Sequence, residues 1–335
     1  MSKRITPFTA FSGRFLPIFR VFLAVSHYNP RLYDYIKAMQ LPFLKMNGAG
    51  NDFVIFDARQ NPVRLTLQQV RKIAARDNTI TKGCDQVIVM EPSKKTDAFM
   101  RIYNADGGEV DACGNATRCV AEILESELGK LPVSIQTNAG ILQGVRKDPE
   151  LDYILVDMGK PKFDWQQIPL AMPLKEAAAK VEKFCNLPKL GAPAFVSMGN
   201  PHVVFFLSFS SKEHKGRNLP IITADVASKG AALERYKEVF PEGVNVSFAA
   251  LDKEEGFAKH IIYAKVWERG AGLTKSCGTA ACAMLAAANA RDSSVREAII
   301  SFDDSHTWVK VEMDDNGHIL LGGFTEIEFQ KTLEL

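Results

Sequence analysis

Two stretches decide the fold: CGNATRCVAEIL at residues 113–124 and CGTAACAMLAAA at residues 277–288. Each opens with Cys-Gly and continues into small and apolar residues, which predicts a buried helix next to the cysteine. Each is preceded, nine residues before its first cysteine, by a polar residue at a predicted strand end, Asn104 or Glu268, and a glycine turn lies between. Because offset, dipeptide and flanking elements agree, the sequence predicts two pseudo-symmetric domains of one architecture.

Short apolar runs separated by glycine-rich turns surround both stretches. In the first half they predict strands at 53–57, 86–90, 99–103 and 153–158, and helices at 65–77 and 113–129. The second half predicts a strand, turn and strand at 194–207, helices at 222–236 and 280–292, and strands at 244–251, 260–268, 298–304, 307–313 and 318–324. In addition, KMNGAGNDFVIF at 45–56 is loosely echoed by VSMGNPHVVFF at 196–206.

The composition is that of an ordinary globular protein. The chain has 335 residues, of which 46% are hydrophobic and 24% charged, enough for a sizeable core. Its 41 basic and 39 acidic residues nearly balance. This balance argues against a nucleic-acid or membrane-surface partner, since both usually require a concentrated basic face.

The N-terminal segment differs from the rest. Residues 1–33 contain five Lys or Arg and no Asp or Glu, and Pro17 and Arg20 interrupt their apolar run. The run is too short and too broken to cross a bilayer. We expect residues 1–38 to be a disordered leader or a misassigned start, with Met39 as a plausible true start.

Six cysteines in a chain of this length are too few for a disulfide scaffold and indicate reduced thiols in a cytoplasmic protein. Within the two stretches, the paired cysteines are six and five residues apart, whereas structural zinc sites usually have C-x2-4-C spacing. We therefore expect no metal site. Cys119 and Cys282 lie inside the predicted helices among apolar neighbours, so we expect them to be core residues.

Cys113 and Cys277 instead lie where a turn becomes a helix. Free backbone N–H groups and the positive end of the helix dipole would lower the thiol pKa there. The adjacent glycines permit close approach, and two converging helix N-termini would bind a carboxylate. A thiolate and a thiol on opposite faces of one carbon could remove and return its proton, which inverts a stereocentre.

A lone cysteine nucleophile is the alternative chemistry. It would need a histidine partner, and His202 in GNPH is the best-placed candidate, although His202 could instead cap a turn. The repetition of Cys-Gly favours symmetric two-base chemistry over one-sided acyl transfer.

Taken together, these motifs closely resemble the diaminopimelate epimerases, cofactor-independent enzymes that interconvert LL-2,6-diaminopimelate and meso-diaminopimelate. The resemblance spans about 43–329, and its strongest segments are KMNGAGNDFVIFD, GCDQ, YNADGGEVDACGNATRCVA, SMGNPHVV, EGVNVSF and WERGAGLTKSCGTAACA. It implies an α/β fold of the α+β type with two domains, each a β-barrel-like sheet around a central helix. The active site would lie in the interdomain cleft, and the domains would be 39–158, completed by 319–335, and 159–318.

The same resemblance assigns the site. It implies proton transfer by Cys113 and Cys277, with Glu268 and His202 influencing the thiols. It also implies substrate contacts by Asn51, Gln86, Asn104, Gly114, Asn115, Asn200, Asn245, Glu268, Arg269, Gly278 and Thr279. Arg269 would bind the distal carboxylate, and the helix-start residues would bind the reacting one. No cofactor, a small-molecule substrate and a possible homodimer are further implications.

The chain departs from the family pattern at a few positions. Ala116 and Ala280 stand where the family often has glycine, Cys84 where an aromatic residue is common, and GGF at 322–324 where Gly-Pro is usual. None of these removes a proposed catalytic group. Rival interpretations are a proline or hydroxyproline racemase-like enzyme, an isomerase of the phenazine-biosynthesis type, and an inactive amino-acid-binding module.

Overall fold

The computed structural model describes residues 40–146, 153–185, 191–207, 225–252, 260–302 and 308–334. The leader expected over 1–38 lies outside these residues. The described chain divides into two compact units, and the larger one, Phe43–Lys331, contains every site residue considered below. Within the described ranges, no helix combines the length and apolar character needed to cross a membrane.

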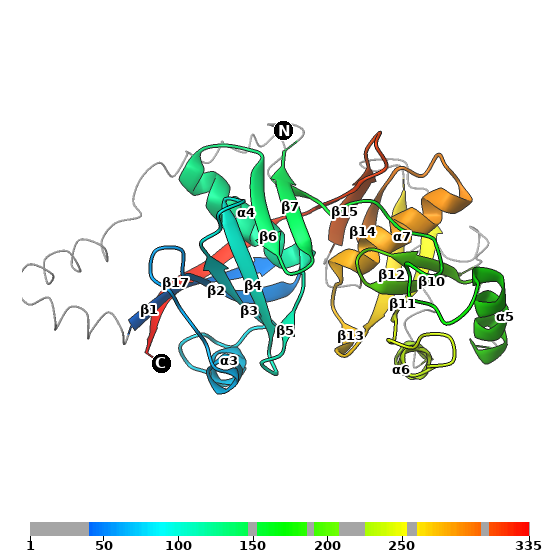
Figure 1. Ribbon diagram of the computed structural model, residues 1–335, viewed down its shortest axis with the longest axis horizontal. Helices are drawn as coiled ribbons and strands as arrows, with labels where there is room; N and C mark the ends of the chain where they lie inside the picture. Colours follow the sequence, from blue (N-terminus) through cyan, green and yellow to red (C-terminus); the bar gives the residue numbers. More distant parts are fainter. Residues whose placement is uncertain are drawn as a thin grey trace, which may run out of the picture. The chain divides into compact units, whose positions relative to one another are not determined.

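The first half forms an ordered set of strands around one long helix (Figure 1). Its helices are α3 Leu67–Ala74 and α4 Gly114–Leu128. Its strands are β1 Gln40–Gly48, β2 Asn51–Asp57, β3 Gln86–Glu91, β4 Ala98–Asn104, β5 Glu109–Val110, β6 Val133–Thr137, β7 Gly140–Val145 and β8 Leu155–Asp157. Strands β1 and β2 are antiparallel, β2 and β3 parallel, β3 and β4 antiparallel, β4 and β6 parallel, and β6, β7 and β8 antiparallel in turn.

The second half repeats this pairing order. Its helices are α5 Leu174–Cys185, α6 Asp225–Glu234 and α7 Gly278–Arg291. Its strands are β9 Ala194–Ser197, β10 Pro201–Phe206, β11 Asn245–Asp252, β12 Ile261–Glu268, β13 Gly272–Thr274, β14 Glu297–Ser301, β15 Trp308–Met313 and β16 Ile319–Gly322. Strands β9 to β16 pair in the same parallel and antiparallel sequence as β1 to β8. The predicted pseudo-symmetric α/β architecture is therefore confirmed.

Helices α4 and α7 are the central helices of the two halves. Helix α4 packs against β6, β7 and β8, and α7 packs against strands β9 to β11 and β14 to β16 (Figure 1). Cys119 and Cys282 are fully buried within the two corresponding cores, as predicted. Both helices are held by apolar contacts, which fixes where their N-termini lie.

Strand pairing joins the two halves at β16. Strand β16 pairs antiparallel with β15 on one edge and with β8 on the other, where Leu320, Leu321 and Gly322 face Asp157, Val156 and Leu155. The last strand, β17 Thr325–Glu334, pairs with β1. The chain thus completes the eighth strand of the second half before it reaches β17.

Several predicted boundaries differ from the observed ones. The strand expected over 153–158 is the three-residue β8, and the helix expected over 65–77 is α3, which starts after the N-cap Thr66. Helix α7 begins two residues earlier than predicted, because the glycine after Cys277 is already helical. Residues 222–224 of one expected helix and 303, 304 and 307 of two expected strands lie outside the described residues.

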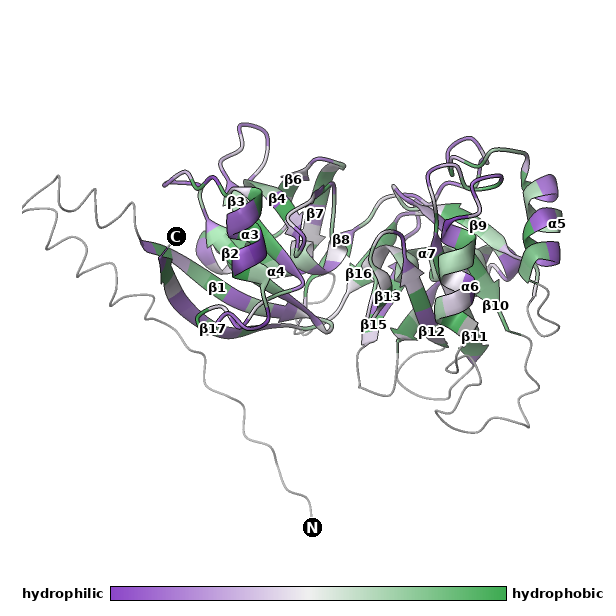
Figure 2. Cartoon of the chain, turned by 90° about the horizontal axis from the view of Figure 1, so that it is seen from below, coloured by the Kyte–Doolittle hydropathy of each residue, from purple (hydrophilic) through white to green (hydrophobic). Residues whose placement is uncertain are grey.

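Helix α5 was not predicted, and it has no counterpart among the described residues of the first half. Figure 2 shows hydrophilic and hydrophobic residues alternating along it. Only Ala177, Val181 and Cys185 are buried, which is a narrow apolar stripe for a helix of 12 residues. Such a stripe is a weaker signal for secondary structure than the continuous apolar runs that predicted the strands.

Candidate active site

Cys113 and Cys277 occupy the same position in their helices. Each is the N-cap residue, with extended backbone angles of φ −148° and ψ 110° at Cys113 and φ −141° and ψ 113° at Cys277. Cys113 is half-buried, and Cys277 is 5% exposed. The structure therefore confirms that both thiols lie at helix N-termini.

The two helix starts meet at Leu321. A Cβ atom added at Gly114 would lie 2.6 Å from Leu321 Cδ2, and one added at Gly278 would lie 2.8 Å from the same atom. The position added at Gly278 is also 3.8 Å from Gly114 Cα, so the two glycines face each other. Glycine at both positions leaves room for this leucine side chain and for the opposite helix.

The thiol pKa values shift in the direction opposite to our expectation. Burial raises the pKa of Cys113 to about 11, although the backbone N–H groups of Ala116 and Asn115 lower it. Burial and the charge of Glu268 raise the pKa of Cys277 well above its usual value, and the Thr279 hydroxyl and Ala280 N–H lower it. Desolvation disfavours the charged thiolate more than the helix ends favour it, so the predicted lowering is wrong.

Glu268 is a charged side chain that affects the pKa of both thiols. Its largely buried carboxylate accepts hydrogen bonds from the Thr274 hydroxyl and the Cys277 thiol. Burial raises the pKa of Glu268, and those two hydrogen bonds lower it. Because its charge also raises the pKa of Cys113, one carboxylate acts on both thiols. A carboxyl group with a raised pKa is a suitable proton acceptor for a thiol.

The strand registers place polar site residues at equivalent positions in the two halves. Gln86 lies opposite Asn104, and its Nε2 donates to Asn104 Oδ1 at 2.9 Å. In the second half, the β11–β12 register extends to place Asn245 opposite Glu268. Asn104 is thus the neutral counterpart of Glu268.

Asn51 and Asn200 form another equivalent pair. Phe53 is in register with Gln86 and His202 with Asn245, so the residues two positions earlier, Asn51 and Asn200, correspond. Both contact the second residue of the neighbouring helix. Asn51 Oδ1 accepts from Asn115 Nδ2 at 2.5 Å, and Asn200 Nδ2 donates to Thr279 Oγ1 at 3.3 Å.

His202 is a neutral, buried neighbour of this second asparagine. Burial and the positive charge of Arg269 lower the pKa of His202 to about 3. Its Nε2 lies 2.8 Å from Asn200 Oδ1, so in the neutral ring Nε2 is the donor. In the described part of the chain it makes no hydrogen bond to either cysteine. The structure gives the cysteine–histidine nucleophile no support.

Asn245 holds the backbone next to the predicted arginine. Its Nδ2 donates to Pro201 O at 3.0 Å, and its Oδ1 accepts from Arg269 N at 2.9 Å. The exposed guanidinium of Arg269 donates to Glu242 O at 3.2 Å. Asn245 therefore positions Arg269, whose charged end remains available at the surface.

Sequence reasoning missed polar residues that join the site together. Ser276 Oγ donates to Ala49 O at 2.8 Å and lies 3.4 Å from Asn115 Nδ2. Asp85 accepts from Asn51 Nδ2 at 3.3 Å. Ser276 and Asp85 directly precede Cys277 and Gln86, and this position was the one sign of their roles in the sequence. Their contacts could not be predicted, because the contacting segments lie far away in the sequence.

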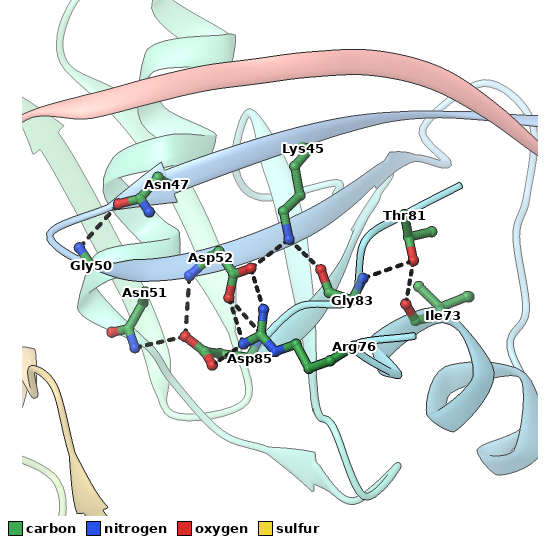
Figure 3. A network of polar contacts seen from close by, with 10 residues as sticks. All are labelled: Lys45, Asn47, Gly50, Asn51, Asp52, Ile73, Arg76, Thr81, Gly83 and Asp85. Atoms are coloured by element: carbon green, nitrogen blue, oxygen red, sulfur yellow. Dashed lines mark hydrogen bonds and ion pairs between the residues drawn. The ribbon is translucent and has the colours of Figure 1, made fainter. Parts of the chain in front are cut away.

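An ionic network supports the first-half residues (Figure 3). Lys45 and Arg76 each donate to Asp52 Oδ2 at 2.5 Å, and Arg76 also donates to Asp85 Oδ1 at 2.5 Å. Burial raises the pKa of Asp52, but the hydrogen bonds from Arg76 and Lys45 outweigh it and hold that pKa at about 2. Burial and the nearby Asp52 charge raise the pKa of Asp85. The network fixes the β1–β2 hairpin and the segment leading to Gln86.

The fold and site define a class of proteins in which a duplicated α/β unit carries an N-cap cysteine at each of two converging helix starts. A solved structure of a phenazine biosynthesis protein of the PhzF family from Enterococcus faecalis shares this fold, with a TM-score of 0.58 at 16% identity, covering 89% of this chain and 100% of that one. At that identity the likeness concerns the fold alone.

Sequence comparison gives the family. The diaminopimelate epimerase family model matches residues 43–164 and 194–325. A diaminopimelate epimerase from Phenylobacterium zucineum is 43% identical over 296 residues, covering 88% of this chain and 99% of the relative. One from Acidiphilium cryptum is 42% identical over 296 residues, covering 88% and 96%. The chain belongs to the diaminopimelate epimerase family.

Proposed function

We propose that the chain interconverts LL-2,6-diaminopimelate and meso-diaminopimelate without a cofactor, using Cys113 and Cys277 as the two proton-transfer groups. The observation that carries this proposal is the pair of N-cap thiols at meeting helix starts, with Glu268 acting on both. Family membership supports the substrate, since the relatives named above are diaminopimelate epimerases.

The proton transfer follows from this arrangement. Glu268 takes the proton of the Cys277 thiol, to which it is hydrogen-bonded, and leaves a thiolate. The thiolate removes the α-proton, and the electron pair of the broken C–H bond delocalises into the substrate carboxylate. Cys113 then gives its thiol proton to the opposite face of the carbon, which inverts it. In the reverse direction the thiols exchange roles.

Helix ends stabilise the charge that develops on the carboxylate. The backbone N–H groups at Gly114 and Asn115 and at Gly278 and Thr279 lie in the first turns of α4 and α7, where N–H groups lack helical partners. Because α4 and α7 meet, both sets are available to one carboxylate. Preorganised donors of this kind favour the transition state over the ground state.

The distal end of the substrate is recognised by other groups. Arg269 binds the distal carboxylate through its exposed guanidinium, held in place by Asn245. Gln86, Asn104 and Asn200 supply amides that donate and accept hydrogen bonds. A set of polar groups placed in this way rejects amino acids that lack a matching distal end.

The proposal also includes a cytoplasmic location, a homodimer and no nucleic-acid partner. The cysteines support the location, since all six are free thiols. The near balance of 41 basic and 39 acidic residues supports the absence of a nucleic-acid partner. Sedimentation of the purified protein tests the homodimer, and a single species at the monomer mass would contradict it.

An exchange experiment tests the function. The protein is incubated with LL-diaminopimelate in D2O without added cofactor, and the α-proton is followed by NMR together with chirality. We expect deuterium incorporation and epimerisation in the wild type, and neither in Cys113→Ala or Cys277→Ala. Exchange with proline but not with diaminopimelate would overturn the proposal, and no exchange with either would favour a binding module.

A further inference from the structure

The side-chain amide of Asn115 has an orientation that leaves its oxygen without a hydrogen-bond donor among the described residues. Its Nδ2 donates to Asn51 Oδ1 at 2.5 Å and to Ser276 Oγ at 3.4 Å. Ser276 donates its hydroxyl proton to Ala49 O at 2.8 Å, so its oxygen is free to accept. Both N–H groups of Asn115 are used, while its buried Oδ1 has no hydrogen-bond partner among the described residues. Such an orientation must be imposed by a neighbour.

Asp85 imposes this orientation through Asn51. A carboxylate only accepts hydrogen bonds, so the Asn51 atom that lies 3.3 Å from Asp85 Oδ2 is Nδ2. Asn51 Oδ1 must then face Asn115. Because this oxygen is an acceptor, Asn115 must donate to it through Nδ2. One charged acceptor thus sets the orientation of two amides in sequence.

Asp85 is itself held against rotation, as Figure 3 shows. Its Oδ1 accepts from Arg76 Nη2 at 2.5 Å, and its Oδ2 accepts from the backbone N–H of Asp52 at 3.2 Å. In return, Asp52 Oδ1 accepts from the backbone N–H of Asp85 at 3.0 Å. Buried Lys45 anchors Asp52 from the other side. The orienting carboxylate therefore has a fixed position.

The second half orients its equivalent amide by a different residue. His202 donates to Asn200 Oδ1, whereas the equivalent position in the first half is Phe53. Conversely, the same registers make Val244 the counterpart of Asp85. Each half therefore orients its asparagine with a different residue, Asp85 in the first half and His202 in the second. The orienting residue is not part of what the two halves share.

We propose that Asp85 is a positioning residue for the substrate. It holds one N–H of Asn51 and thereby keeps the second N–H of that half-buried amide as a donor for a carboxylate bound at the helix starts. With the amide reversed, Asn51 would present a carbonyl oxygen to that carboxylate, and the two would repel. This inference rests on the proposed function, because it requires an amino-acid carboxylate at this place.

A double-mutant cycle tests the inference. The variants are Asp85→Asn, Asn51→Ala and the double variant, and kcat and KM for LL-diaminopimelate are measured for each. The amide of Asp85→Asn can donate or accept, so the orientation of Asn51 is no longer set. We expect a fall in kcat/KM of about tenfold, mainly through a higher KM, and no further fall when Asp85→Asn is added to Asn51→Ala.

Arg76→Gln is the matched control, because it removes the same Arg76–Asp85 ion pair but leaves the Asp85–Asn51 contact. We expect it to change kcat/KM less than threefold. Asp85→Ser replaces Asp85→Asn if the latter melts well below the wild type. A wild-type KM in the Asp85 variant would overturn this inference but not the proposed function. The same holds if the Asp85 substitution lowers kcat/KM equally in the wild-type and Asn51→Ala backgrounds. A wild type that does not epimerise diaminopimelate would overturn the proposed function and this inference with it.

Discussion

At the scale of residues, the two cysteines share a position but not their surroundings. Cys277 is hydrogen-bonded to Glu268, whereas the equivalent strand position beside Cys113 is Asn104. The sequence indicated both thiols, yet not the direction of their pKa shifts, because burial is invisible in a motif. Ser276 and Asp85 escaped detection for a related reason, since their roles depend on contacts with distant segments.

Replacing Glu268 by glutamine tests its role as proton acceptor. We expect Glu268→Gln to lower kcat/KM by about a hundredfold, the usual order for loss of a general base. In the wild type, activity should fall as the pH drops through the Glu268 pKa, which is raised above its ordinary 4.5. The variant should lack this acid limb in a pH profile of kcat/KM. An unchanged acid limb in Glu268→Gln would assign that titration to another group.

Asp52 provides a test of stability at the same scale. Asp52→Asn leaves the buried Lys45 without its anion, and we expect a loss of about 3 kcal/mol in the free energy of unfolding at pH 7. Since the folded pKa of Asp52 is lowered from 3.8 to about 2, its contribution is present above pH 3.8 and is lost as the pH falls through 2. Urea denaturation at several pH values measures the free energy of unfolding of the wild type and of Asp52→Asn. A difference that is constant with pH would contradict the ionic explanation.

At the scale of elements, apolar runs and punctuating glycines predicted most strands and both central helices. The end of α4 was predicted well because Gly129 adopts the left-handed conformation that glycine favours, with φ 62°. The hairpin of β6 and β7 was missed, since GILQGV carries two glycines and only one buried residue. The division into domains 39–158 with 319–335 and 159–318 stays a prediction.

The contact between the helix starts gives a prediction for Gly278. In Gly278→Ala the new methyl would lie 2.8 Å from Leu321 Cδ2, and relieving this overlap should cost about 1–3 kcal/mol of stability. Adding Leu321→Ala should cost less in the Gly278→Ala background than in the wild type. Chemical denaturation of the four proteins measures the coupling. Purely additive losses would show that the overlap is relieved without involving Leu321.

At the scale of the whole molecule, the fold repeats itself, so the helix starts that carry Cys113 and Cys277 lie close together although the cysteines are 164 positions apart in the sequence. The repeat of Cys-Gly predicted this convergence, and the catalytic pairing of the two thiols stays a prediction. Both β8 and β16 were predicted as strands, but their pairing could not be predicted, because the pairing of strands far apart in the sequence leaves no local pattern.

Oxidation tests whether the two thiols face one another. A mild oxidant should inactivate the protein by joining Cys113 to Cys277, and a thiol reductant should restore activity. Cys119 and Cys282 are fully buried in the cores and should stay reduced, which peptide mapping by mass spectrometry can verify. Full activity in the cross-linked protein would refute the assignment of these cysteines to catalysis.

The repeated pairing order is the structure expected from the duplication of one ancestral half. Two identical halves would surround the reacting carbon with identical groups, but here Asn104 corresponds to Glu268 and Phe53 to His202. The two thiols therefore have different neighbours at equivalent positions. We expect solvent isotope effects on kcat to differ between the LL-to-meso and meso-to-LL directions, and equal effects would mean that divergence of the halves has left proton transfer symmetric.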